Sequence, residues 1–185
     1  MGEPKGLFLH AGRPWILTQL ETLRDIGLVH VVVILGYQSD LYLTAIPSLP
    51  DICQVAINEV PQYGPFSSLQ CGIRQSLLTN PAGIFVLPVD SPCPDKEVWS
   101  QLAEAPDSET QACLPTWNGD GGHPVLLSPN FAKFLADFPL EHVDARLDVQ
   151  MFRLPPKFLK RVSSGDRKIC FNLNTPEDFK RHAPC

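Results

Sequence analysis

Apolar residues along this chain follow two patterns, one with helical spacing and one of continuous runs typical of buried strands. Between positions 14 and 26 they recur with helical spacing, at Ile16, Leu17, Leu20, Leu23 and Ile26. This spacing predicts an amphipathic helix over 14–26, which Pro14 can begin and Gly27 can end. The β-branched run over 28–35 that follows is closed by Gly36 and is typical of a buried parallel strand.

The same two patterns continue through the rest of the chain. Further helices are predicted over 39–46, 66–78, 95–103 and 130–138, with Ser39 and Ser67 as candidate caps. Further strands are predicted over 52–57, 83–89, 111–115, 124–127 and 169–173. Residues 144–160 mix prolines with an irregular pattern, which favours a loop containing a bent strand. Thr175 followed by Asp178 has the spacing of a capping box and predicts a short last helix.

Strands that alternate with helices predict an α/β fold with a mostly parallel sheet and right-handed crossovers. We expect three layers, with helices on both faces of a Rossmann-like sheet. No internal repeat, low-complexity segment or linker divides the chain, and its 185 residues suit one domain with a sizeable core. The expected organisation is therefore a single domain over residues 1–185.

Composition narrows the classes of partner. A formal charge of −5 argues against a nucleic-acid binder, which normally carries a basic face. No apolar run approaches the roughly 20 residues that span a bilayer, and the first residues lack the apolar core of a secretory signal. The six cysteines include no closely spaced pair, which argues against a zinc or dithiol site. We therefore expect a cytoplasmic protein without a membrane or nucleic-acid partner.

One carboxylate stands out by its position. The apolar run over 83–89 ends in Asp90, and prolines follow at 92 and 94. Ligands of open α/β sheets bind beyond the carboxyl ends of strands, and a lone acid there can hold Mg²⁺ together with water and substrate phosphates. The alternative is an ordinary turn, because Asp before Ser-Pro is common turn chemistry.

Four other polar segments are candidates for ligand contacts, and the first three have a structural alternative. Lys5 lies beside glycine and proline and could neutralise phosphate, or simply be solvated. The small residues over 64–68 enter a helix, where backbone N–H groups can face an anion or only begin the helix. His123 lies in a compact turn and could contact substrate or only form a hydrogen bond. Asn172 and Asn174 point to one side of an extended segment.

Three common nucleotide and hydrolase motifs are absent from the sequence. It contains no Walker loop, no Gly-x-Ser-x-Gly elbow and no Gly-x-Gly-x-x-Gly fingerprint. Hydrolases with a nucleophile elbow, P-loop enzymes and dinucleotide-binding proteins therefore lose support.

Taken in chain order, these segments resemble the MobA-like nucleotidyltransferases, which include the molybdenum-cofactor guanylyl- and cytidylyltransferases. The matching segments are Met1–Lys5, Gly64–Leu69, Leu87–Pro92, Gly122–Pro124 and Asn172–Asp178. The resemblance spans nearly the whole chain and implies a fold like that of the nucleotide-diphospho-sugar transferases. The Asn-x-Asn-Thr-Pro-Glu-Asp segment resembles the guanylyl branch and Gly-His-Pro the cytidylyl branch, so GTP and CTP both stay open.

The resemblance also implies roles for individual residues. Lys5 and Asp90 are the expected catalytic residues, with Lys5 on the triphosphate and Asp90 on Mg²⁺, helped by Asn174. The nucleotide pocket is expected to be lined further by Gly36, Gly64, Ser67 and Ser68. His123 and Asn172 are expected on the acceptor side. The implied reaction transfers a nucleoside monophosphate from an NTP to an acceptor phosphate such as molybdopterin and releases pyrophosphate, chiefly by positioning and charge neutralisation.

The chain departs from the family pattern in three ways. The family has a strand and a glycine-rich loop immediately before the segment that begins here at Met1. We therefore expect an N-terminally truncated domain with two open strand edges in mid-sheet and little activity. Gln70 stands where arginine is frequent, and Asn172 and Asn174 stand where some relatives have aspartates.

Two other functions remain open at this stage. One is a nucleotidyltransferase for a sugar or polyol phosphate, because the same scaffold serves those acceptors. The other is a catalytically inactive nucleotide-binding or regulatory module, favoured by the absent loop. The sequence leaves the acceptor and the oligomeric state undetermined.

Overall fold

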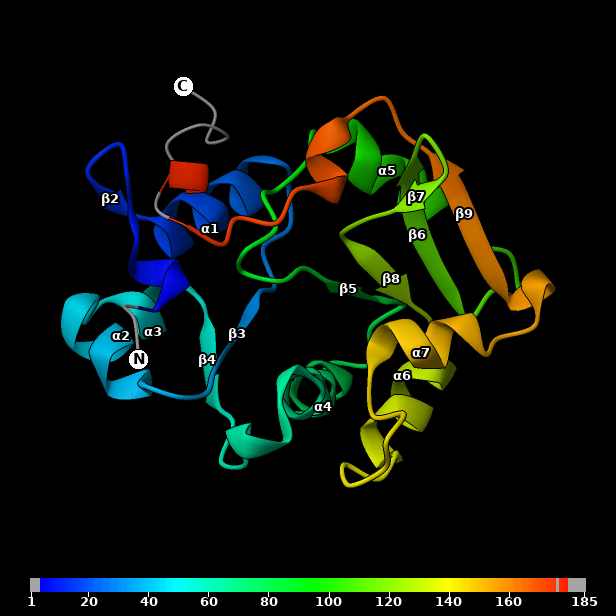
Figure 1. The fold of residues 1–185 in the computed structure, drawn as a ribbon, viewed down its shortest axis with the longest axis horizontal. Coiled ribbons are helices and arrows are strands. Elements are labelled where there is room, and N and C mark those ends of the chain that lie inside the picture. The colour runs from blue at the N-terminus through cyan, green and yellow to red at the C-terminus, as the bar shows by residue number, and fades with distance from the viewer. Residues whose placement is uncertain (1–3, 176, 180–185) are drawn as a thin grey trace.

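The computed structural model describes residues 4–175 and 177–179, and it forms an α/β fold with helices on both sides of its strands (Figure 1). The α-helices are α1 (Trp15–Asp25), α2 (Ser39–Ala45), α3 (Leu49–Ile52), α4 (Pro65–Leu77), α5 (Lys96–Glu104), α6 (Pro129–Asp137) and α7 (Leu147–Phe152). The strands are β1 (Leu9–His10), β2 (Arg13–Pro14), β3 (Val32–Leu35), β4 (Gln54–Ile57), β5 (Ile84–Val86), β6 (Ala112–Trp117), β7 (Asp120–Gly121), β8 (Val125–Leu127) and β9 (Leu159–Ser163). Short 3-10 turns are η1 (Lys5–Leu7), η2 (Pro61–Tyr63), η3 (Pro156–Phe158) and η4 (Arg167–Cys170).

The strands form a parallel pair, β3–β4, and a five-stranded sheet in the order β5-β8-β6-β7 with β9 also paired to β6. A small hairpin, β1–β2, precedes α1. In the larger sheet only β6–β9 is parallel, while β5–β8, β6–β8 and β6–β7 are antiparallel. The expectation of a mostly parallel sheet is therefore wrong, although the α/β class holds.

A tight turn explains the mixed strand directions. Asn118 and Gly119 have positive φ values of 51° and 92°, and they turn β6 directly into β7. The chain then returns along β6 as β8 without an intervening helix. A connection this short can join only antiparallel strands, because a parallel crossover needs a dozen or more residues.

Within the described residues, β3 and β5 each have one edge without a strand partner, as do β4, β7 and β9. Within the described part of the chain, β3 pairs only with β4 and β5 pairs only with β8. Helix α4 packs against both β3 and β5. Strand edges are thus open at β3 and β5, and the truncation that led us to expect open edges stays a prediction.

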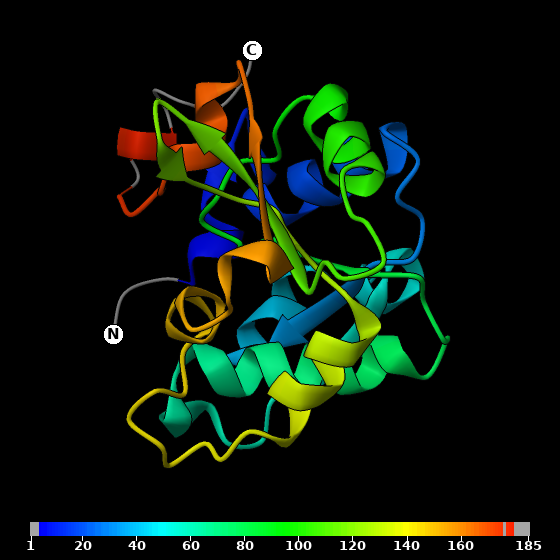
Figure 2. The ribbon, with the colours of Figure 1, turned by 90° about the vertical axis from the view of Figure 1, so that its right-hand side faces the viewer.

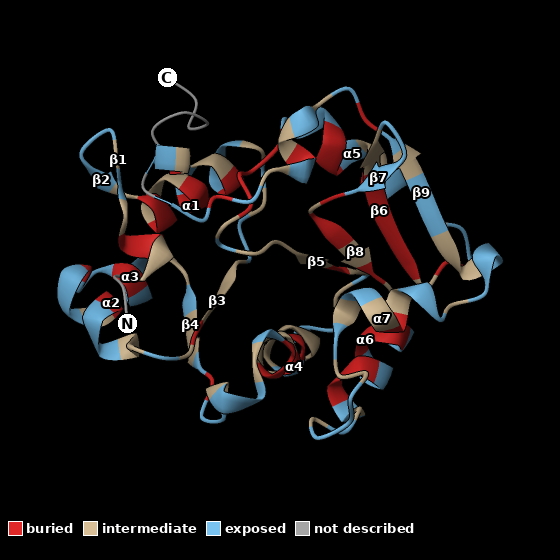
Figure 3. Ribbon diagram, in the orientation of Figure 1, coloured by how far each residue is buried: buried red, intermediate tan, exposed pale blue. Residues whose placement is uncertain are grey.

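The five-stranded sheet separates two apolar layers. Alternate residues of β6 and β8 face opposite sides, as the two-residue period of a strand requires. Ala112, Leu114, Val125 and Leu127 join the cluster made with α4 and α6, whereas Cys113 and Leu126 join the cluster around α5. Figure 2 shows α4 and α6 below the strands and α5 above them, and Figure 3 shows the buried positions between these layers.

The amphipathic helix predicted over 14–26 is confirmed as α1. Its buried side carries Ile16, Leu20 and Leu23. Trp15 at its start packs with Leu173 and Phe179 from the other end of the chain. Helix α1 therefore ties the C-terminal segment to the N-terminal part of the fold.

Several local expectations need correction. The strand predicted over 169–173 is absent: η4 ends at Cys170, and the extended residues after it join no sheet. The last sheet strand is β9, inside the segment predicted as a loop with a bent strand. Only two of its five side chains are even partly buried, so its sequence lacks an apolar strand pattern. Helices α3 and α7 were not predicted because they are one or two turns long.

The predicted caps are also corrected. Ser39 and Ser67 lie inside their helices, and the cap positions are Gln38 and Gly64, both with positive φ. The capping box at Thr175 is confirmed, since Thr175 N–H donates to Asp178 Oδ2 at 2.9 Å and Asp178 N–H donates to Thr175 Oγ1 at 3.2 Å. Of the helix that it was expected to begin, residues 177–179 are helical, and the rest of the prediction lies outside the described residues.

Candidate active site

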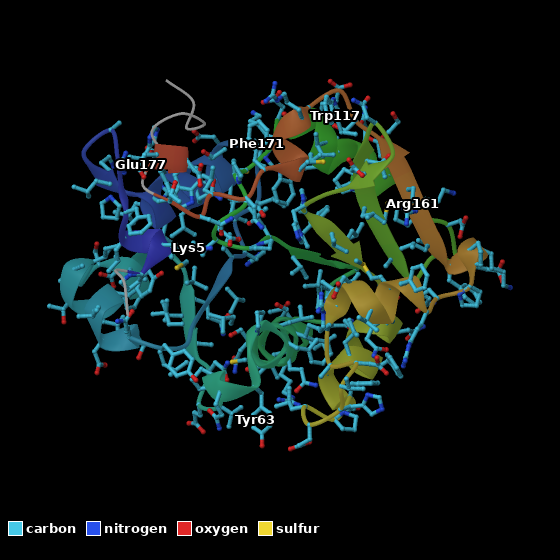
Figure 4. All side chains as sticks on the ribbon, viewed as in Figure 1. Lys5, Tyr63, Trp117, Arg161, Phe171 and Glu177 are labelled. Carbon is cyan, nitrogen blue, oxygen red and sulfur yellow. The ribbon has the colours of Figure 1, made fainter. Side chains whose placement is uncertain are left out.

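Lys5 bonds one carboxylate oxygen and one amide oxygen, both from residues far from it in the sequence. Its Nζ donates to Asp90 Oδ2 at 2.8 Å and to Asn174 Oδ1 at 2.7 Å, across 85 and 169 positions of chain. The three side chains come from η1, from the loop after β5 and from the C-terminal segment. Figure 4 labels Lys5 on its turn. The structure thus brings together three residues that the sequence nominated separately.

Asn172 completes this group. With its amide nitrogen facing the carboxylate, it donates to Asp90 Oδ2 at 3.2 Å and to Oδ1 at 3.3 Å. The backbone N–H of Leu173 donates to the Asp90 carbonyl at 2.7 Å. The C-terminal segment therefore contacts both the side chain and the backbone of Asp90.

The group is half-buried and rich in oxygen. The side chains of Lys5 and Asp90 are 35% and 23% exposed, so solvent and a small ligand can reach them. Within residues 4–175 and 177–179, no cluster of three or more His, Cys, Asp and Glu side chains could hold a metal ion. A single carboxylate with amide oxygens suits a hard cation that keeps water and phosphate ligands, as Mg²⁺ does.

Tyr42 in α2 supports the turn that carries Lys5. The Gly6 N–H donates to the Tyr42 hydroxyl at 3.2 Å. A Cβ atom on Gly6 would lie only 2.7 Å from that hydroxyl oxygen, so the turn is pressed directly against the ring. Burial raises the pKa of Tyr42 above its ordinary value of 10.0.

His123 is partly buried and lies close enough to Asp90 to feel its charge. Its backbone N–H donates to the Ile169 carbonyl at 2.9 Å. Burial of the imidazole lowers its pKa below 6.5, against the opposing effects of the Asp90 charge and a hydrogen bond with the Val86 backbone. Its Nδ1 is buried and has no hydrogen-bond partner among the described residues. Burial therefore favours the neutral form of the His123 imidazole.

The residues nominated for the nucleotide pocket gather at the ends of β3 and β4. Asn58, directly after β4, donates from Nδ2 to Ser67 Oγ at 2.8 Å and to Ser68 Oγ at 3.0 Å. The Ser67 hydroxyl in turn donates to the Gly64 carbonyl at 2.8 Å. Ser67 is thus fully engaged within the protein, whereas the Ser68 hydroxyl keeps its proton for another acceptor.

Sequence reasoning missed Asn58. It is buried, with 4% of its surface exposed, and its Oδ1 accepts from the Val60 N–H at 3.0 Å. Its position as the polar residue immediately after a strand, the criterion that identified Asp90, could have revealed it.

The two glycines of this group allow close packing and an unusual turn. A Cβ on Gly36 would lie 3.3 Å from Pro61 Cβ in η2, and Gly64 has a φ of 77° at the start of α4. Leu35, immediately before Gly36, packs in one buried cluster with Leu7, two residues after Lys5. This packing links the pocket group to the Lys5 turn.

The buried side chain of Gln70 forms hydrogen bonds between two helices. Its buried Nε2 donates to the carbonyls of Leu135 at 2.8 Å and Phe138 at 2.6 Å, and its Oε1 accepts from Arg74. The side chain therefore joins α4 to the end of α6.

Known proteins share this sequence pattern and this fold. A family model described as "MobA-like NTP transferase domain" matches residues 1–151. No curated protein sequence matches the chain.

The helices of the described residues include none that is long and apolar enough to cross a membrane.

Three solved structures illustrate the similarity of fold. Rv0371c from Mycobacterium tuberculosis H37Rv, in complex with manganese, is 20% identical over 97% of this chain and 91% of its own, with a TM-score of 0.71. A nucleotidyl transferase from Methanothermobacter thermautotroptrophicus, Mth528, is 19% identical over 96% of this chain and 82% of its own, with a TM-score of 0.74. A 4-diphosphocytidyl-2C-methyl-D-erythritol synthase is 14% identical over 96% of this chain and 90% of its own, with a TM-score of 0.68.

These comparisons confirm both the resemblance and the fold class drawn from the sequence. The family match covers most of the chain, and it includes Lys5, Asp90, His123 and the pocket residues. This protein belongs to the MobA-like NTP transferase family and is a nucleotidyltransferase.

Proposed function

We propose that the chain transfers a nucleoside monophosphate from GTP or CTP to an acceptor phosphate such as molybdopterin, with Mg²⁺, and that pyrophosphate is released. The observation that carries this proposal is the meeting of Lys5, Asp90 and Asn174 within hydrogen-bond distance. An ammonium, a carboxylate and an amide oxygen together match the needs of a metal-bound triphosphate.

In this proposal each residue has a defined task. Asp90 and the Asn174 amide oxygen would hold Mg²⁺, which supplies charge neutralisation to the phosphate oxygens. Lys5 would exchange its present partners for phosphate oxygens, as a flexible point charge can. Transfer then depends on alignment of the two phosphates, because such a reaction needs little covalent help from the protein.

The remaining candidates are assigned by location. Gly36, Gly64 and Ser68 would line the nucleotide site, with Ser67 supporting it from inside. Asn172 and His123 flank Asp90 and would face the acceptor. The manganese complex of Rv0371c supports a divalent cation in this fold, and the oxygen donors favour Mg²⁺ as the working ion.

We also propose that residues 1–185 form one domain that works in the cytoplasm. The five cysteines within the described residues are all free, which suits a reducing compartment. A sugar or polyol phosphate is the second candidate acceptor, and the cytidyl product named for one structural neighbour favours testing it.

The test measures binding and transfer in the same protein. Calorimetry of GTP and CTP with Mg²⁺ should show binding of one nucleotide, and Asp90→Asn should weaken it by at least about tenfold, or 1.4 kcal/mol. The matched control is Asp137→Asn, which removes the same charge from an exposed position on α6.

Release of pyrophosphate with a panel of acceptor phosphates then identifies the acceptor. Binding without transfer to any acceptor would favour the nucleotide-binding module. Equal binding by Asp90→Asn and the unaltered chain would contradict the role given to Asp90.

A further inference from the structure

Helix α1 holds the loop that carries Asp90. Trp15 and Gln19 lie one turn apart on the same side of this helix. The Trp15 Nε1–H donates to the Val89 carbonyl at 2.7 Å, and Gln19 Nε2 donates to the Ser91 carbonyl at 2.7 Å. Since Leu173 N–H donates to the Asp90 carbonyl, three successive carbonyls around Asp90 each have a separate donor.

Gln19 uses both ends of its amide on this loop. While its nitrogen donates to the Ser91 carbonyl, its Oε1 accepts from the Cys93 N–H at 3.0 Å. Gln19, Ser91 and Cys93 are 6%, 3% and 8% exposed, so water cannot replace these bonds. A buried carbonyl and N–H left without partners are costly, and therefore the loop conformation depends on this amide.

The direction of the Asp90 side chain follows from the backbone on either side of it. Trp15 fixes the residue before Asp90, and Gln19 fixes the residue after it. Among the described residues, the side chains of Lys5 and Asn172 bond the carboxylate oxygens of Asp90. When Lys5 turns to a phosphate, the backbone contacts of α1 remain to hold the carboxylate in place.

We propose that Gln19 is a positioning residue for the Asp90 carboxylate and thereby sets the affinity of the site for a divalent cation. This inference rests on the function proposed above. Gln19 itself touches neither metal nor substrate. Outer partners of this kind typically change metal affinity by roughly 10–100-fold when they are removed.

The experiment compares Gln19→Leu with a variant that is destabilised elsewhere. Leu135→Ala opens a cavity between α4 and α6, far from the Asp90 loop in the fold, and lowers stability without removing a loop contact. Mn²⁺ binding is measured by electron spin resonance with and without GTP or CTP, at a temperature where circular dichroism shows every variant folded. We expect Gln19→Leu to weaken Mn²⁺ binding by roughly tenfold or more and Leu135→Ala to leave it unchanged.

A conservative variant refines the test. Gln19→Glu keeps the acceptor for the Cys93 N–H but loses the permanent donor to the Ser91 carbonyl. It should bind Mn²⁺ with an affinity between those of Gln19→Leu and the unaltered chain. Equal losses in Gln19→Leu and Leu135→Ala would overturn the positioning role, because the effect would then follow stability alone.

A second readout does not depend on the metal. Amide hydrogen exchange of Leu173, whose N–H donates to the Asp90 carbonyl, should be accelerated in Gln19→Leu by more than its loss of global stability explains, and in Leu135→Ala by no more than that loss explains. Unchanged exchange in Gln19→Leu overturns the inference even if Mn²⁺ binds. Absence of Mn²⁺ binding in the unaltered chain overturns the metal site of the proposed function and, with it, the effect of Gln19 on affinity.

Discussion

The backbone of Gly122 lies so close to the Ile169 carbonyl that no side chain fits between them. A Cβ atom on Gly122 would be 2.3 Å from the Ile169 oxygen and 2.7 Å from its carbon. The same carbonyl accepts the His123 N–H at 2.9 Å. The close approach of the Gly122 backbone to the Ile169 carbonyl therefore helps to position His123, which follows it in the chain.

Gly122→Ala should lower the free energy of unfolding by about 1–3 kcal/mol, because the methyl group meets backbone that cannot yield cheaply. Urea unfolding followed by tryptophan fluorescence measures this. Gly165→Ala is the matched control, since its Cβ would have no atom within 4 Å, and its stability should change by less than about 0.5 kcal/mol. Similar stabilities for the two variants would show that the segment at 122 can move away.

The burial of His123 makes stability depend on pH. Its folded pKa lies below 6.5, so the unfolded chain binds a proton more readily than the folded one. The stability associated with the buried neutral imidazole is fully present above the pKa of His123 in the unfolded chain. It is lost as the pH falls below that value, towards the pKa of the folded chain. Protonation thus favours unfolding in mildly acid solution.

Thermal unfolding between about pH 8 and about pH 5.5 tests this sign. The unaltered chain should lose stability as the pH falls, and His123→Gln should lose less over the same range. A steeper loss in His123→Gln than in the unaltered chain would contradict the assigned direction.

At the scale of elements, α4 connects the candidate pocket to the largest core. Its first turn carries Ser67 and Ser68, and its middle carries Ile73 in the cluster shared with α6. Gln70 lies between them and bonds the carbonyls at the end of α6. The orientation of α4, and so of its first turn, depends on this buried amide.

Gln70→Leu keeps the volume of the side chain but leaves two carbonyls of α6 without their donor. We expect a loss of about 1–3 kcal/mol in the free energy of unfolding by urea. Gln75→Leu, on the same helix, removes only a surface bond with Gln54 and should cost less than about 0.5 kcal/mol. A neutral Gln70→Leu would mean that the α6 carbonyls find other donors.

At the scale of the molecule, the candidate site depends on packing between the two ends of the chain. Phe8 and Trp15 meet Phe179 edge to face, with ring centroids 5.2 Å and 5.3 Å apart. Leu173, between Asn172 and Asn174, is buried in the same cluster. This packing brings the Asn172 amide to Asp90 and the Asn174 amide to Lys5, so a ligand bound there links segments from three parts of the fold.

A ligand that bridges these segments should stabilise the whole molecule. Thermal unfolding is measured with each of the four NTPs, with and without Mg²⁺. At ~100 times its Kd, the correct nucleotide should add about 2.7 kcal/mol, and a chelator should remove the gain. A shift with GTP or CTP alone identifies the base. Stability unaffected by every NTP would contradict a working nucleotide site in this chain.

The sequence by itself determined the features that short stretches of chain encode. The helical spacing of α1, α4, α5 and α6 and the apolar runs of β3, β4, β5, β6 and β8 were all predicted, although their ends moved by a few residues. Asp90 was recognised because a polar residue at the end of an apolar run carries a local signal, whereas the roles of Lys5, Asn172 and Asn174 were implied by the family resemblance. These features can be predicted because capping, turn formation and amphipathic spacing depend on residues that are close together in the sequence.

Only the tertiary structure decided which of these pieces meet. The pairing of β9 with β6 joins residues that no local spacing relates, and so do the hydrogen bonds of Asn58, Gln19 and Gln70. A buried amide such as Gln19 looks like any polar helical residue until its partners, more than seventy positions away, are known. Long-range hydrogen bonds and packing set these pairings, and therefore the Lys5–Asp90–Asn174 geometry emerges only in the folded chain.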